Sequence, residues 1–196
     1  MNRKEDGGQA IIELALALPM MVLLVFGVIE FGSALNHTMV LTAAAREGAR
    51  VAGALANGGG PLGCGSGQSP NAATVDPAVV AAVERVLTAS GTQISLADVS
   101  EIRIYKSTLS GAETTGAVNQ WTYALNAGPL IGGERLDFAE QSNTWTACVR
   151  NNVTPADSVG ITVRYLYRSR TPLRYFMPFT AINLSATTVM TLNATR

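Results

Sequence analysis

The stretch QAIIELALALPMMVLLVFGVI, residues 9–29, decides what kind of fold this chain can adopt. From Leu14 to Ile29 there are 16 residues without a charged or hydrogen-bonding side chain. Adding Ala10 to Ile12 gives about 20 residues interrupted only by Glu13, and a helix of that length crosses a bilayer core of about 30 Å. The stretch therefore predicts a membrane segment over residues 9–32 and argues against a purely soluble protein.

The composition of the whole chain narrows the function classes. Among 196 residues, Lys and Arg total 14 and Asp and Glu total 14, so the formal net charge is zero. Because nucleic-acid affinity comes largely from neutralising phosphates, we expect no nucleic-acid partner. One His and two Cys leave little material for a multi-ligand zinc site or a His-dependent catalytic centre. We therefore expect no enzyme, with no catalytic residue, no metal site and no cofactor.

The chain is predicted to have four parts. They are a polar leader (1–8), one long helix (9–57, transmembrane over 9–32 and amphipathic over 33–57), a Gly-rich linker (58–70) and a globular α+β domain (71–196). The linker holds six glycines between Gly58 and Gly67. Such a stretch has too much backbone freedom to continue the helix.

The globular part shows the periodicities of both helix and strand. Asp76-Pro77 predicts the start of a helix that runs to Ser90, with apolar residues at helical spacing. Alternating apolar residues predict strands at 99–106, near 121–125, at 159–168 and at 184–192. About four antiparallel strands packed on the end of the long helix make a pilin-like α+β fold. The intervening segments 106–118 and 126–158 are predicted to be surface loops.

Three interpretations of the apolar segment remain open from the residues alone. It could be a secretory signal cleaved near Gly32-Ser33-Ala34, a plain membrane anchor, or the N-terminal helix of a pilin-like subunit. Glu13 bears on the choice, because an acid inside an apolar helix costs free energy and usually marks function. A signal peptide has no use for it. A solvated Glu13 at the inner headgroup level is the alternative.

The residues around Glu13 carry a family resemblance. Gly8, followed by Gln9 and with Glu13 as the fifth residue after the cut, resembles a type IV prepilin peptidase site. Residues 8–19, 27–32 and 44–50 together resemble the TadE-like family, the pseudopilins of the tight-adherence (Flp) pilus system. A looser similarity relates residues 163–173 and 182–186 to the family's C-terminal strands and their proline-containing crossover. Residues 54–158 carry no such resemblance.

The resemblance implies a pseudopilin or pilin-like structural subunit that assembles through its N-terminal helix into a tight-adherence pilus, or initiates one. Its implied partners are other pilin-like subunits, the inner-membrane assembly machinery and prepilin peptidase. Cleavage after Gly8 would create an α-amino group on Gln9, which Glu13 of a neighbouring subunit could neutralise. Pro19 is expected to kink or loosen the helix, either to help extraction from the bilayer or as a tolerated membrane proline. The alternative function is a single-pass, membrane-anchored extracytoplasmic binding module.

A second candidate interface lies further along the helix. Ala44, Gly48 and Ala52 recur every four residues, a spacing that lets helices approach closely, and Arg46 and Arg50 lie on another face. These residues predict either an interface with a second pilin-like helix or packing on the chain's own domain with the arginines solvated.

The remaining polar residues give weaker expectations. Glu30 lies about 25 Å beyond Glu13 along a helix and is expected to mark the outer headgroup level. His37 is expected at the headgroups rather than in a catalytic role. Glu134, Asp137 and Glu140 could share the face of a short solvated helix, with calcium as the less favoured alternative.

The two cysteines and the basic residues concern topology. Arg3 and Lys4 favour a cytoplasmic N-terminus, so residues 36–196 are expected outside the bacterial cell membrane, or in an extracellular pilus. On that side a disulfide between Cys64 and Cys148 is expected, worth about 4 kcal/mol in the chain-entropy model. Two free thiols or a catalytic pair are the alternatives.

Overall fold

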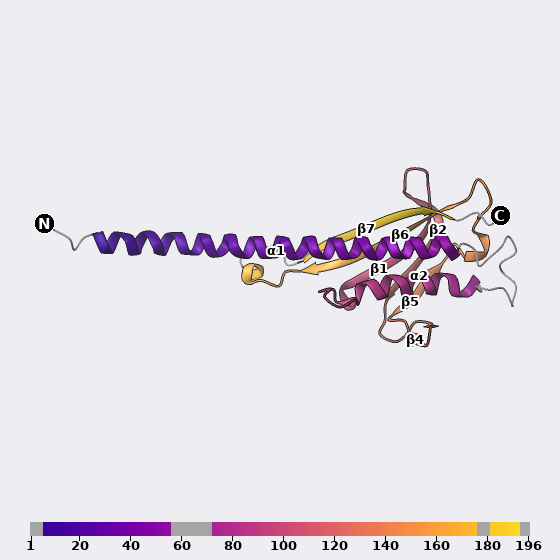
Figure 1. Ribbon diagram of the computed structural model, residues 1–196, viewed down its shortest axis with the longest axis horizontal. Helices are drawn as coiled ribbons and strands as arrows, with labels where there is room; N and C mark the ends of the chain where they lie inside the picture. Colours follow the sequence, from indigo (N-terminus) through magenta and orange to yellow (C-terminus); the bar gives the residue numbers. More distant parts are fainter. Residues whose placement is uncertain (1–5, 56–71, 176–180, 193–196) are drawn as a thin grey trace. The chain divides into compact units, whose positions relative to one another are not determined.

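The computed structural model describes residues 6–55, 72–175 and 181–192 (Figure 1). Its elements in chain order are α1 (Asp6–Leu55), α2 (Ala72–Leu87), η1 (Leu96–Asp98), β1 (Val99–Ser107), β2 (Glu113–Tyr123), β3 (Leu130–Ile131), β4 (Glu134–Arg135), β5 (Phe138–Asn143), η2 (Ala147–Val149), β6 (Ser158–Arg168), η3 (Pro172–Tyr175) and β7 (Ala181–Thr191). The chain divides into two compact units, residues 1–36 with 167–182, and residues 37–166 with 183–196. The predicted Gly-rich linker 58–70 lies outside the described residues, whereas the predicted cleavage point between Gly8 and Gln9 lies within the described part of α1.

The long N-terminal helix is confirmed. Helix α1 runs through Pro19 without a break, because one missing N–H removes only a single hydrogen bond from the helix ladder. In the first unit its apolar side chains from Ile11 to Phe31 are mostly exposed. In the second unit the same helix buries small residues, such as Ala45 and Ala49.

An antiparallel sheet forms the second unit, as predicted, but it has five strands in the order β5-β2-β1-β6-β7. Strand β1 is central, with Ile102 opposite Trp121 on β2 and Ile104 opposite Ile161 on β6. The fifth strand, β5, lies in a segment predicted to be a loop. Its sequence FAEQSN has one fully buried residue, Phe138, so an edge strand of this kind shows no apolar alternation. Strands β3 and β4 form a separate two-stranded ribbon.

The core of this unit lies between the sheet and the two helices (Figure 1). Gly48 on α1 lies where the two helices and the sheet are close together, since a Cβ atom placed there would lie 2.6 Å from Cγ2 of Val83 on α2 and 3.4 Å from Cγ2 of Ile161 on β6. A larger side chain would push the helices apart, so the small residues of α1 set the spacing of the layers.

Two predictions about local structure are wrong. Helix α2 begins at Ala72, five residues before the predicted start at Pro77, and Asp76 lies inside the helix, where it is buried in an ion pair. Glu134 lies in β4 and Glu140 in β5, with Asp137 between these strands, so the three acids do not share a helix. Their spacing of three residues is equally compatible with two short strands and a turn.

Candidate functional site

The residues predicted for processing and assembly lie at the exposed start of α1. Gly8 has open space on the side where a Cβ atom would be. The side-chain amide of Gln9 donates a hydrogen bond from Nε2 to Oε1 of Glu13 at 3.0 Å, one helical turn away. A carboxylate accepts several hydrogen bonds, so this contact leaves acceptor positions on Glu13 for a second donor.

The surface that follows is a continuous apolar face. Helix α1 is long and apolar enough to span a membrane, with a mean hydropathy of 2.5 over an 18-residue window in which no residue is buried. Five of its side chains fall on one stripe at helical spacing: Leu14, Leu18, Met21, Val22 and Val25. Pro19 lies beside this stripe, within a helix that continues on both sides. An exposed apolar surface of this length calls for lipid or other helices around it.

Glu30 is more than a boundary marker. Its Oε1 accepts a hydrogen bond from the hydroxyl of Tyr167 at 2.6 Å, and its Oε2 accepts one from the backbone N–H of Thr171 at 3.3 Å. Tyr167 lies near the end of β6, and Thr171 lies just before η3. The carboxylate thus fixes the segment after β6 beside the helix within the first unit, a contact between residues 137 apart that spacing alone cannot predict.

The small-residue stripe and the two arginines face different ways. Ala44 and Gly48 are buried in the second unit, and Gly48 lies close to Val83 on α2 and Ile161 on β6. Arg46 and Arg50 are exposed, and Arg50 pairs with Glu47 at 2.6 Å. Any intermolecular contact at this part of the helix would therefore involve the arginine face and not the small residues.

His37 departs from its predicted place. It is 1% exposed, its ring lies 5.4 Å from the ring of Tyr165, and its Nε2 is 3.1 Å from the carbonyl oxygen of Gln93. The headgroup assignment is therefore wrong, because this helix face is already covered by the sheet.

The cysteines can be followed only in part. Cys148 lies exposed in η2 and is not a free thiol. Cys64 lies outside the described residues, so the pairing of these two cysteines stays a prediction.

A buried polar network was missed by the sequence reasoning. Nη2 of Arg150 lies 2.6 Å and 2.8 Å from the two carboxylate oxygens of Asp76. Asn119 donates to the same carboxylate at 2.7 Å and accepts from the backbone N–H of Trp145 at 2.8 Å. The guanidinium carbon of Arg150 lies 4.5 Å from the ring centroid of Trp145. No local signal could have revealed this cluster, since Asp76 and Arg150 are 74 residues apart.

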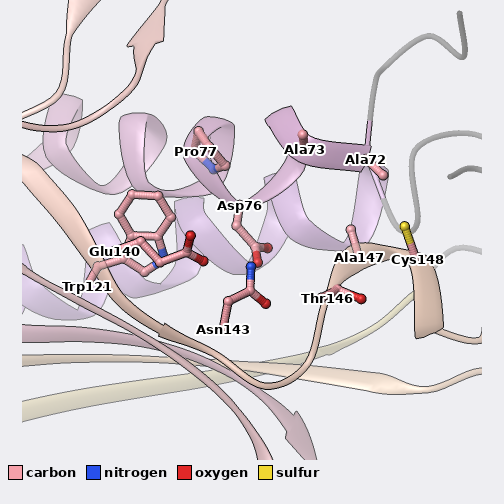
Figure 2. Close-up of a pocket in the computed structure, with 10 residues that line it drawn as sticks. All are labelled: Ala72, Ala73, Asp76, Pro77, Trp121, Glu140, Asn143, Thr146, Ala147 and Cys148. Atoms are coloured by element: carbon pink, nitrogen blue, oxygen red, sulfur yellow. The ribbon is translucent and has the colours of Figure 1, made fainter. Parts of the chain in front are cut away.

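Next to this network is a pocket of about 320 Å³, with Trp121 and Cys148 at opposite ends (Figure 2). Two polar side chains of β5 line the pocket, Glu140 within the strand and Asn143 at its end. Burial raises the pKa of the Glu140 carboxyl, and the negative charge of Asp76 acts in the same direction. Trp121 is 1% exposed, and its indole N–H makes no hydrogen bond within the part of the chain that the structure describes. Among the described residues, no group of three or more His, Cys, Asp or Glu side chains is arranged to hold a metal ion.

Comparison with known protein families matches residues 8–50 to a family model described as TadE-like protein. The match covers Gly8, Gln9, Glu13 and Pro19 as well as the exposed apolar face of α1. No curated protein and no solved structure matches the chain. The resemblance of the N-terminal helix to the TadE-like family is therefore confirmed over residues 8–50.

Proposed function

We propose that this chain is a pilin-like structural subunit, a TadE-like pseudopilin whose N-terminal helix assembles into a tight-adherence pilus or initiates one. The observation that carries the proposal is the TadE-like match over α1, the one helix among the described residues that is long and apolar enough to span a membrane. The exposed apolar surface of this helix can be covered in two environments, by the bilayer before assembly and by other helices after it. Membrane anchoring and filament packing thus use the same side chains in sequence.

In this proposal, cleavage after Gly8 is the step that permits assembly. Before cleavage, Glu13 has the side-chain amide of Gln9 as its partner. Cleavage gives Gln9 a charged α-amino group at the positive end of the helix dipole. In a stack of apolar helices, Glu13 of one subunit pairs with that amine of its neighbour, which offsets two desolvation costs and sets the axial register. Prepilin peptidase, other pilin-like subunits and the inner-membrane assembly machinery are the partners this requires.

The proposed topology follows the basic residues. The N-terminus is cytoplasmic, α1 crosses the bacterial cell membrane once, and the sheet domain is extracytoplasmic. That compartment permits the proposed disulfide between Cys64 and Cys148. The domain then either stays at the membrane surface or is carried into an extracellular pilus.

The decisive experiment separates membrane insertion from assembly. Glu13→Ala and Glu13→Gln should be processed and inserted normally, with membrane abundance unchanged or higher, because an acid within the span costs free energy. Sheared surface filaments should be lost in both. Glu47→Gln, which removes a partly exposed acid from the same helix, is the matched control and should leave filaments intact. Normal filaments from Glu13→Ala would sink the assembly role.

Processing is tested separately by mass. The native protein should lack residues 1–8, and Gly8→Leu should accumulate a chain heavier by those eight residues. Gly8→Ala is too mild a change to decide the matter, because a small residue can substitute at such a site. A mature Gly8→Leu protein that still begins at Gln9 would refute the peptidase assignment.

A second candidate function is a membrane-anchored binding module, and the pocket beside β5 favours it (Figure 2). A buried indole N–H and the exposed carboxylate of Glu140 beside one opening are groups that a polar ligand could satisfy. In that case Glu140→Ala should abolish adhesion to the captured surface, while Glu13→Ala should leave adhesion unchanged. The pseudopilin proposal requires the opposite pair of results.

A further inference from the structure

The segment after β6 is held at one level of helix α1. The two hydrogen bonds that Glu30 accepts, from Tyr167 and from the backbone of Thr171, attach this segment to the helix at residue 30. The uncharged apolar stretch of α1 ends one residue earlier, at Ile29. The attached segment therefore lies where the membrane span of α1 ends.

Among the side chains that the structure describes here, two arginines and an exposed tyrosine occupy that level. Arg168 follows Tyr167 directly, and Arg170 precedes Thr171 directly. The Cα atom of each arginine therefore lies within about 4 Å of the Cα atom of a residue that is hydrogen-bonded to Glu30. Both arginines are exposed. Tyr175, at the end of η3, is 74% exposed. Phe31 on the helix is 67% exposed at the same height.

This combination matches the chemistry of the lipid headgroup region. Guanidinium groups bind phosphate with two parallel hydrogen bonds, and five N–H donors allow an arginine to keep a protein contact while doing so. Exposed aromatic side chains are enriched at the same depth, where a ring meets both apolar and hydrated surroundings. The Glu30 carboxylate at this level faces Tyr167 and Thr171.

We propose that residues 168–175 form a lipid-binding collar, in which Arg168 and Arg170 bind the phosphates of anionic lipids in the leaflet where α1 leaves the membrane. The collar fixes the depth of the helix and thereby the height of the residues that follow it. The inference rests on the membrane placement in the proposed function and is independent of pilus assembly. A failure of the lipid test with normal filaments, or the reverse, therefore distinguishes the two.

The test uses the purified full-length chain in detergent and native mass spectrometry. Phosphatidylglycerol and phosphatidylcholine with identical acyl chains are titrated in parallel, and their dissociation constants are compared. Wild-type protein should prefer phosphatidylglycerol. Arg168→Gln with Arg170→Gln should reduce that preference about 25-fold, or about fivefold for each arginine.

The matched control removes the same charge elsewhere. Arg46→Gln with Arg50→Gln, on the exposed face of α1 in the second unit, should change the preference less than twofold. Arg168→Lys with Arg170→Lys keeps the charge but loses the bidentate geometry, so an intermediate loss is expected, and this pair replaces the Gln variant if that variant does not fold. An unchanged preference in the collar variants, or an equal loss in the control, would overturn the proposal.

Discussion

Replacing Arg150 by Met should destabilise the sheet domain strongly. The Arg150 side chain is 0% exposed and that of Asp76 is 6% exposed, so water cannot replace the lost partner. After the substitution, the Asp76 carboxylate keeps the amide of Asn119 at 2.7 Å but no positive charge. The change therefore leaves a buried and uncompensated carboxylate between α2 and the sheet.

The expected loss is about 3–5 kcal/mol, the typical cost of breaking a buried ion pair from one side. Domains of this kind are stable by about 5–15 kcal/mol, so the variant should still fold without denaturant but should unfold at a much lower urea concentration. With a urea dependence of about 2 kcal/mol per molar, the unfolding midpoint should fall by about 2 M. Adding Asp76→Asn to Arg150→Met removes the stranded charge and should restore more than half of the loss.

The assay is urea unfolding of the full chain in detergent, followed by tryptophan fluorescence. The chain has two Trp residues, and both Trp121 and Trp145 lie in the second unit, so the signal reports on that unit. Lys106→Met is the control, because its pair with Asp157 at 2.7 Å is 41% exposed on the lysine side and should cost less than about 1 kcal/mol. A loss below about 1 kcal/mol for Arg150→Met, or strictly additive effects in the double variant, would refute the reasoning.

Three further predictions concern packing, pH and topology. Gly48→Ala should cost about 1–3 kcal/mol despite the better helix propensity of Ala, because its Cβ would lie 2.6 Å from Val83; Gly27→Ala, with nothing within 4 Å, should cost the domain nothing in the same urea assay. Burial, together with the negative charges of Asp137 and Glu134, raises the pKa of the Glu84 carboxyl. The native state therefore binds the carboxyl proton more tightly than the unfolded state, and it loses stability as pH rises from the unfolded pKa through the higher native pKa. Glu84→Gln should therefore gain stability over wild type between pH 4 and pH 7, and an advantage that shrinks over this range would contradict the assignment. Protease added to intact spheroplasts should remove the sheet domain, whereas full protection would reverse the proposed topology.

The elements predicted well from the sequence are those with a long and regular pattern. Strand β6 contains the alternating sequence 159–168 that predicted it, and its apolar residues Val159, Ile161 and Val163 are all fully buried. The apolar run of α1 likewise needs no partner to be recognised, since its length and hydropathy are local properties. The family resemblance of residues 8–50 rests on the same continuous segment.

The errors occur where a residue's role depends on a distant partner. Asp76 before Pro77 is a typical helix-start pattern, yet the carboxylate pairs with Arg150 and the helix begins earlier. Strand β5 has few apolar residues because it lies at a sheet edge and gains its hydrogen bonds from β2. The burial of His37, which was expected at the headgroups, could not be predicted because its covering groups, Tyr165 and the carbonyl of Gln93, come from segments far along the chain.

The sequence by itself determined the membrane-compatible helix, the positions of Gly8, Gln9 and Glu13 at its start, and the alternation of the central strands, because periodicity and hydropathy act over a few turns of chain. The tertiary structure alone decided that Glu30 holds the segment after β6, that Gly48 serves the domain's own core, and that Asp76 meets Arg150. Those outcomes depend on which groups, distant in the sequence, become buried against one another when the chain folds. Such desolvation is a property of the packed chain, and no local pattern encodes it.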